Sequence, residues 1–304
     1  MLATSPHARV FTPLVPSPLT LLAPWEFAPT VPIACAVGGI LYWRGWRRRQ
    51  QAGLATGVGR TLSFYLGLVL IYGVMQTYVD YLSQHMFWVH RAQHLVLHHL
   101  APFLIMLAVP HEVLGWGLPA GLRERVLLPL WRSPPVRLAY RVVQNPVVSP
   151  LLFVGLIYFW LMPSVHFAAM LSASRYQLMN WSMVLDGLLF WWLVLDPRSP
   201  REPGVLGYPA RIALLWAIML PQIAIGAHIA LSKSVLYDVY SVCGRAWPLS
   251  PLVDQETGGI ITWIPAAMMS VLAILLVLRM WMRHSARVER APAPPRARLS
   301  RSLP

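Results

Sequence analysis

The hydrophobic positions of this chain gather in seven long segments, separated by shorter stretches rich in arginine, proline and other polar residues. A helix needs about 20 mainly apolar residues to cross the hydrocarbon core of a bilayer, and each segment is close to this length or longer. The pattern predicts spans at 28–46, 61–82, 86–110, 147–167, 178–196, 209–232 and 257–282. We therefore expect an all-α, polytopic membrane protein, a bundle of seven transmembrane helices.

Composition agrees with the pattern, because 57% of the 304 residues are hydrophobic and only 12% are charged. A net charge of +14 would also suit a nucleic-acid-binding protein. The basic residues, however, lie in the connections between spans and do not form one patch, so we expect no nucleic-acid partner. The expected partner of the apolar surface is the lipid bilayer.

Charge also predicts the orientation. If the seven spans alternate in direction, 20 of the 25 lysines and arginines fall on one side of the membrane. Basic connections stay in the cytoplasm. This rule predicts an N-terminus outside the membrane and a cytoplasmic C-terminus.

The same reading divides the chain into three parts. Residues 1–27 are interrupted by prolines and are expected to be an outer-face segment rather than a signal peptide. Residues 28–283 form the membrane domain, in which an amphipathic stretch at 118–131 suits the membrane surface. Residues 284–304 are rich in proline, alanine and arginine, and we expect a disordered basic tail in the cytoplasm.

The clearest candidate chemistry is a histidine stripe in the third span, within HMFWVHRAQHLVLHH at 85–99. In a helix, His90, His94 and His98 would share one face and rise by about 6 Å per step. Polar rings inside a membrane are costly unless they have partners, so such a stripe marks a functional site. We expect all three rings to face the interior of the bundle.

Predicted topology adds two histidines to the same half of the membrane. His166 ends the fourth span and His228 lies near the end of the sixth. Imidazole binds copper, zinc and haem iron, and nearby thioethers such as Met86 and Met179 favour Cu(I). The alternative is structural: histidines that bond to neighbouring helices, and methionines that fill the core.

Other residues leave more than one interpretation open. Asp186 is an acid in the fifth span, which needs a partner there. It either orients a histidine or accepts hydrogen bonds from Asn, Ser or Trp. The pair Trp191 and Trp192 suggests an aromatic belt at the membrane interface. The two cysteines lack a metal-binding spacing.

Three motifs carry a resemblance to a known family. They are HRAQHLVLHHLAP at 90–102, GLLFWW at 187–192 and SPLVDQETGGIITW at 250–263. Together they resemble the multi-spanning CtaG-type cytochrome c oxidase assembly factors, over about residues 25–283. By motif match, the positions His90, Gln93, His94, Asp254 and Gln255 carry over.

The resemblance implies a bacterial inner-membrane protein that helps to mature a haem–copper oxidase by handling copper. Its partners would be oxidase subunits or a periplasmic copper chaperone. Many relatives have a histidine pair, HxxxH, at the start of the fifth span, where this chain has Tyr176 and Asn180. These two would then be hydrogen-bonding neighbours of the metal ligands, and His98, His166 and His228 would be the available substitutes.

Three other functions compete with a copper-binding assembly factor. A haem b electron carrier or oxidoreductase would need paired ligands such as His94 and His228. A transporter would need polar residues that continue to the inner face, and the spans offer few. An enzyme is disfavoured by the absence of a nucleophile–base pair or a phosphate loop in the sequence, and Asp254 and Glu256 are expected to cap their own helix. We therefore expect a non-enzymatic assembly factor that binds copper as Cu(I). His90 and His94 are the expected ligands, and His98, His166 and His228 are the candidates to complete the site.

Overall fold

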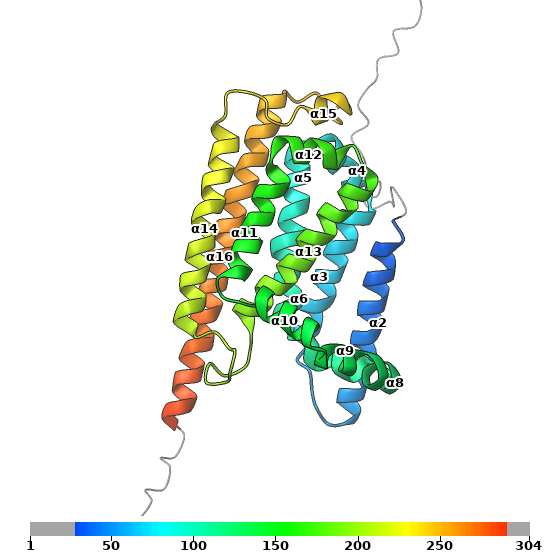
Figure 1. The fold of residues 1–304 in the computed structure, drawn as a ribbon, viewed down its shortest axis with the longest axis vertical. Helices are drawn as coiled ribbons and strands as arrows, with labels where there is room; N and C mark the ends of the chain where they lie inside the picture. The colour runs from blue at the N-terminus through cyan, green and yellow to red at the C-terminus, as the bar shows by residue number, and fades with distance from the viewer. Residues whose placement is uncertain (1–27, 291–304) are drawn as a thin grey trace, which may run out of the picture.

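The computed structural model describes residues 28–290, and this part of the chain contains helices and no β-strand (Figure 1). The predicted all-α class is confirmed. The predicted N-terminal segment 1–27 lies outside the described residues.

Five helices are long. They are α2 (Thr30–Gln51), α3 (Val58–Gln76), α13 (Ala173–Leu195), α14 (Tyr208–Leu231) and α16 (Pro251–Arg290). The third predicted span is instead a series of shorter pieces. They are α5 (Phe87–His94), the π-helix η1 (Leu95–Leu100), α6 (Ala101–Leu107) and α7 (Pro110–Gly117). The remaining helices are α4 (Tyr78–His85), α8 (Ala120–Leu122), η2 (Arg123–Leu127), α9 (Leu128–Arg132), α10 (Pro134–Val143), α11 (Val148–Leu161), α12 (Pro163–Met170) and α15 (Val239–Val242).

Length and apolar composition identify four helices in the described range that can cross a membrane: α3, α13, α14 and α16. Two pairs bent by 72° raise this number to six if each pair is one span: Phe87–Leu107 with α7, and α10 with α11. The helix α2, which ends in a run of basic residues, is not among them. A multi-pass membrane protein is therefore supported, whereas the count of seven spans stays a prediction.

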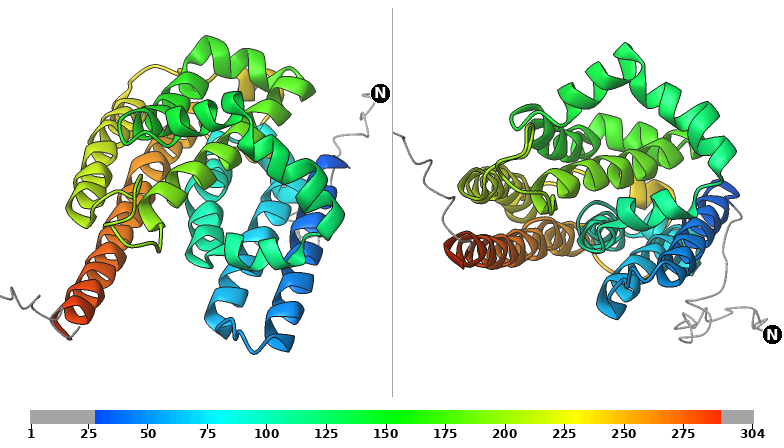
Figure 2. Two further views of the ribbon diagram at one scale, coloured as in Figure 1. Left: turned by 60° about the horizontal axis from the view of Figure 1, so that its bottom comes forward. Right: turned by 90° about the horizontal axis from the view of Figure 1, so that it is seen from below.

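The broken third span lies at the centre of the bundle. Its pieces contact α3 on one side, α13 on another and α16 on a third, while α14 packs along α16 (Figure 1). The end-on view in Figure 2 shows the teal α6 between the blue N-terminal helices and the orange α16. The side chains of the third span are therefore enclosed by other helices.

The break in this span has a local cause. Pro102 has no N–H, so the His98 carbonyl four residues earlier loses its helix partner. Trp191 of α13 supplies a donor instead, with its Nε1 3.3 Å from the His98 carbonyl oxygen. Gly187 makes this approach possible, because a Cβ there would lie 2.5 Å from that same oxygen. Trp191 is fully buried, so its interpretation as part of an interfacial belt is wrong.

The motif around Asp254 holds α16 against the start of α5. The Asp254 carboxylate accepts hydrogen bonds from the backbone N–H groups of Phe87, at 3.1 Å, and Trp88, at 2.9 Å, and it pairs with Arg245. It therefore caps α5 and not its own helix, which corrects the expectation from sequence. The reason is that α16 already begins at Pro251, so the Asp254 side chain is free to reach the neighbouring helix.

Gln255 and two glycines complete this contact. The Gln255 side chain accepts from Leu236 N–H at 2.6 Å and donates to the Ser234 carbonyl at 3.0 Å, which fixes the loop after α14. A Cβ at Gly258 would lie 2.3 Å from the Phe87 ring, and one at Gly259 would lie 2.5 Å from a backbone nitrogen of α14. The motif at 250–263 thus packs α16 against α5 and α14.

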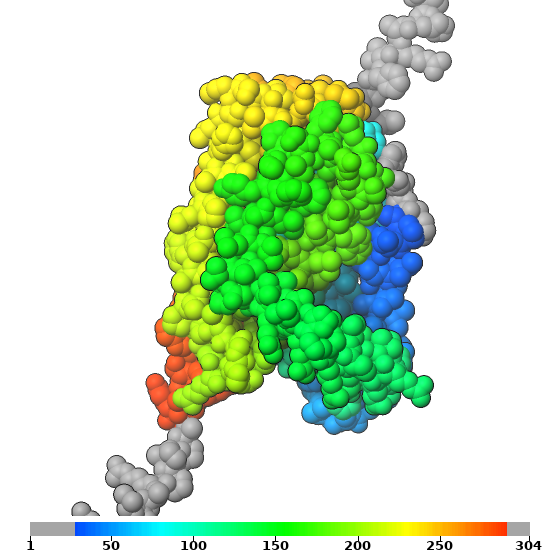
Figure 3. All heavy atoms as spheres, in the orientation of Figure 1, coloured from blue at the N-terminus to red at the C-terminus, as the bar shows by residue number. Residues whose placement is uncertain are grey.

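The basic elements gather at one end of the bundle. The C-terminal ends of α2 and α16, the segment α8–α10 and the loop before α14 all lie at the lower end in Figure 1. The segment α8–α10 projects from this end in Figure 3 and exposes Leu130, Trp131 and Leu138, as a membrane-surface segment would. Helix α16 continues past the predicted boundary at 283 to Arg290.

Candidate functional site

Three histidines from two elements come together near the end of the bundle that carries α15. The ring centroids of His90 and His94, both on α5, are 4.3 Å apart. The His166 ring of α12 lies 5.0 Å from His90. All three side chains are buried, as is His98, so the expectation that the stripe faces the interior is confirmed. We call His90, His94 and His166 the histidine cluster.

His90 stands out because neither of its ring nitrogens makes a hydrogen bond of ordinary geometry, although the ring is fully buried. The Ser83 backbone carbonyl is the nearest acceptor for the ring N–H. A buried polar atom without a partner costs about 1–3 kcal/mol, and folded proteins pair nearly all such atoms. A neutral imidazole carries its proton on one nitrogen, so the other His90 nitrogen has a lone pair open to a ligand.

His94 has one engaged nitrogen and one open nitrogen. Its Nε2 lies 3.2 Å from the Asn180 Oδ1, and an amide oxygen only accepts, so Nε2 carries the proton. The Nδ1 atom then presents a lone pair, and this atom is buried without a partner. A neutral imidazole with one N–H held and one free lone pair is the form that binds metal ions.

His166 differs, because both of its nitrogens are engaged. Its Nδ1 lies 3.1 Å from the Trp160 carbonyl oxygen, to which it donates, and its Nε2 accepts from the Tyr240 hydroxyl at 2.9 Å. Its predicted role as a ligand would require the Tyr240 bond to break. His166 therefore packs against the ring of His90 and is itself bonded to Tyr240, which lies in the connection before α16.

Tyr176 and Asn180 flank the cluster, as expected for neighbours of the ligands. The Tyr176 ring centroid is 6.1 Å from that of His90. Its hydroxyl donates to the Asp80 Oδ1 at 2.7 Å and lies 2.8 Å from the Ser83 Oγ. Tyr176 and Asn180 thus face His90 and His94.

Gln93 contacts the neighbours of the histidine cluster, and its Oε1 accepts from the Tyr176 hydroxyl at 3.2 Å. Its Nε2 donates to the Asp80 Oδ1 at 2.9 Å and to the Val74 carbonyl at 2.7 Å. It therefore joins α5 to α3 and α4 and holds the Asp80 carboxylate in place behind Tyr176. Asp80 is a site residue that the motif did not single out, although an acid at the end of a predicted span is a signal for it.

His98 is turned away from the cluster. Its Nε2 lies 3.0 Å from the Asp186 Oδ2, and its ring stacks on Phe153 with 3.9 Å between centroids. Of the two interpretations of Asp186, the one in which it orients a histidine therefore agrees with the structure. His228 is exposed on α14, and no ring contact with the cluster is found for it in the described range.

The two candidate thioethers pack in the core. Met86 lies in an apolar cluster with Leu82 and Val89, and Met179 belongs to the main core. A cavity beside His94, His98 and His99 has about 10 Å³ of room for a water-sized sphere, enough for about one water molecule. Among residues 28–290, no group of three or more His, Cys, Asp or Glu side chains is placed to hold a metal ion.

Arg91 is a further residue that the sequence motif contained but did not explain. Its side chain is buried, and its Nε donates to the Thr262 Oγ1 of α16 at 3.0 Å. It also borders the small cavity beside His94. A charged residue inside a predicted span is the signal that points to it.

A surface pocket of about 610 Å³ opens next to the cluster. Its lining includes Gln84, Met170, Tyr176 and Gln177, and Tyr176 separates it from His90. The loop that carries α15 closes another side, where Tyr237 stacks on Phe87 with 4.2 Å between ring centroids. The cluster is thus enclosed, with Tyr176 between it and the surface.

Residues 40–284 match the model of the cytochrome c oxidase caa3 assembly factor family, Caa3_CtaG. The chain belongs to this family. The match contains all three motifs, and therefore the whole histidine cluster, its flanking residues Tyr176 and Asn180, and the α5 cap at Asp254.

Individual relatives are similar over nearly the whole chain. Uncharacterized proteins of Mycobacterium leprae, Mycobacterium bovis and Mycobacterium tuberculosis are each 28% identical to it over 291 residues, which is 91% of this chain and 42% of each relative. The chain thus spans about two fifths of the length of these relatives. No solved structure matches.

Proposed function

We propose that this protein is a non-enzymatic membrane assembly factor for a haem–copper cytochrome c oxidase and that it binds Cu(I) for that enzyme through His90 and His94. Family membership supports the assembly role. The observation that carries the copper role is a pair of adjacent, buried imidazoles whose free nitrogens have no partner. Unpaired donor atoms at this depth are costly unless a ligand uses them.

The two imidazole donors suit a metal ion that is bound and then transferred to a partner protein. His90 and His94 offer neutral nitrogen ligands, and Cu(I) accepts imidazole and thioether donors. Two ligands leave the coordination of the ion incomplete, so a copper chaperone or an oxidase subunit would supply the others during transfer. Asn180 holds the His94 tautomer, and Tyr176 lies beside His90 with its hydroxyl fixed on the Asp80 carboxyl group.

The membrane placement follows from the same proposal. We place the protein in a bacterial inner membrane with the α15 end of the bundle in the periplasm and seven spans in alternation. The basic elements at the opposite end support this orientation. Copper would then enter from the periplasmic side, through the pocket beside Tyr176. The haem b alternative gains no support, because the cavity beside His94 and His98 holds about one water molecule.

The assembly role is tested by removing the protein from its host. We expect the haem–copper oxidase subunits to be made and to carry haem, while the copper-to-haem ratio of the purified oxidase and its activity both fall. Excess copper in the medium should restore part of the activity, because it bypasses a delivery step. A normal copper-to-haem ratio of the oxidase in the deletion strain would contradict the copper role. If the activity of the oxidase were normal too, the assembly role would also be contradicted.

A further inference from the structure

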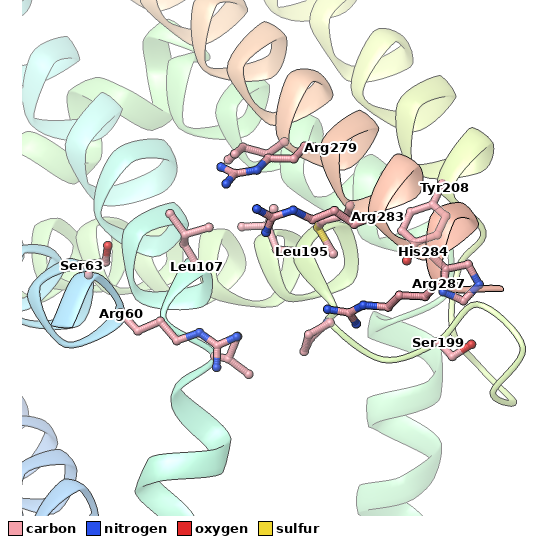
Figure 4. A pocket seen from close by; sticks show the side chains of 15 residues that line it. Arg60, Ser63, Leu107, Leu195, Ser199, Tyr208, Arg279, Arg283, His284 and Arg287 are labelled. Carbon is pink, nitrogen blue, oxygen red and sulfur yellow. The ribbon is translucent and has the colours of Figure 1, made fainter. Parts of the chain in front are cut away.

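A pocket larger than the one beside Tyr176 lies at the basic end of the bundle. It has a volume of about 650 Å³ and lies between α3, α16 and the loop that follows α13 (Figure 4). Four arginines and a histidine line it: Arg60, Arg279, Arg283, His284 and Arg287. Nothing in the proposed copper function uses these residues.

The arginines of the pocket come from two helices, α16 and α3. Arg279, Arg283 and Arg287 follow one another at intervals of four residues along α16, so they share one face of the helix. Figure 4 shows their side chains extending from α16 into the space before α3, while Arg60 extends toward them from the α3 side. Cationic groups therefore enter the pocket from two walls.

These charges have few partners within the protein. No Asp or Glu side chain is among the residues that line the pocket. The acid next to the wall, Asp196, already pairs with Arg198 at 2.6 Å. Arg60 lies 3.8 Å from Glu112, and no ion pair of Arg279, Arg283 or Arg287 is found in the described range. Guanidinium groups that line one pocket repel one another, and a bound anion would offset this repulsion.

The remaining lining distinguishes between possible anions. Leu107, Leu276 and Met280 supply an apolar part of the wall. On the same helix, Leu272 and Leu275 are exposed on the outer surface of α16, where hydrocarbon would contact them. A lipid that places its phosphate among the arginines can lay its acyl chains along these residues, whereas a free phosphate leaves the apolar wall unused.

We infer that this pocket binds the phosphate headgroup of an anionic phospholipid from the leaflet at the basic end of the bundle. Guanidinium groups bind phosphate oxygens with paired hydrogen bonds, and basic pockets between membrane helices on the cytoplasmic side bind such headgroups. The bound lipid would join α3 to the last turns of α16, which otherwise project beyond the bundle (Figure 1). This inference does not depend on the copper function.

Native mass spectrometry of the full chain in neutral detergent tests the inference. The probes are cardiolipin, phosphatidylglycerol, phosphatidylcholine and inorganic phosphate, each titrated separately. We expect the two anionic lipids to bind, and the triple variant Arg279→Gln/Arg283→Gln/Arg287→Gln to bind them roughly tenfold or more weakly, because it removes the three cations that α16 presents to the headgroup. The single variant Arg60→Gln should weaken binding too, since it removes the cation of the opposite wall.

A matched variant separates the pocket from net charge. Arg123, Arg132 and Arg137 are exposed at the same end of the bundle and do not line the pocket, so replacing all three by glutamine removes the same charge. We expect this control to keep anionic lipid binding near the wild-type level, and circular dichroism shows whether both triple variants remain helical. Equal binding of phosphatidylcholine, equal loss in the two triple variants, or binding of inorganic phosphate as tightly as of lipid would each overturn the inference.

Discussion

Cells in which His90 and His94 are both replaced by glutamine are expected to keep the protein in the membrane and to lose the copper-loaded oxidase. The two rings lie 4.3 Å apart and present the free nitrogens of the cluster, so the double variant removes both proposed ligands. Glutamine is of similar size to histidine and keeps the interior filled. The measurement is the copper-to-haem ratio and activity of the oxidase purified from these cells.

Two other histidines provide the control for this experiment. His99 bonds to Gln222 at 3.3 Å, and His228 is exposed on α14, so neither belongs to the cluster. The variant His99→Gln/His228→Gln should therefore support normal oxidase maturation. If the His90→Gln/His94→Gln cells contain a fully copper-loaded oxidase, the histidine cluster is structural and the copper role is wrong.

Replacing Asp254 by asparagine is expected to lower the stability of the whole bundle by about 3–5 kcal/mol, the usual cost of removing one member of a buried ion pair. The carboxylate is fully buried, pairs with Arg245 and accepts two N–H groups at the start of α5. The variant leaves the Arg245 charge without its partner. Unfolding of the purified protein in mixed micelles measures the change.

Glu256 gives a matched control on the same helix. It is exposed, and no ion pair is found for it within the described part of the chain. Glu256→Gln removes the same charge two residues away and should change the free energy of unfolding by less than about 0.5 kcal/mol. Equal stability of the Asp254→Asn and Glu256→Gln proteins would show that the cap on α5 contributes little.

The fold class and the position of most long helices could be predicted because apolar segments of membrane length dominate the sequence. The interruptions are less evident. The break at Met162 has a signal in Pro163, because the residue before a proline disfavours the helical conformation. The break at Met86, after which α5 begins, has no proline beside it. Hydropathy registers the length of a segment and carries no information on where its hydrogen bonds change partners.

The histidine stripe shows the same limit at the site. A spacing of four residues predicts a common face only if the helix is an ordinary α-helix. The π-helix η1 begins directly after His94 and holds more residues per turn, so His98 turns toward Asp186 instead of joining the cluster. The pairing of His90 with His94, and the approach of His166, followed from spacing and topology. The face of α14 that carries His228 did not, because its apolar residues occur on all sides.

Anaerobic titration of the purified full chain with Cu(I), in competition with a chromophoric Cu(I) chelator, tests the central claim most directly. The account predicts that the wild-type protein takes a single Cu(I) ion from the chelator. It predicts that His90→Gln/His94→Gln binds at least about 100-fold more weakly, since loss of groups that merely orient ligands already costs 10- to 100-fold, while His99→Gln/His228→Gln behaves as the wild type. A wild-type protein that takes no copper, or a His90→Gln/His94→Gln variant that binds it equally well, would contradict the account.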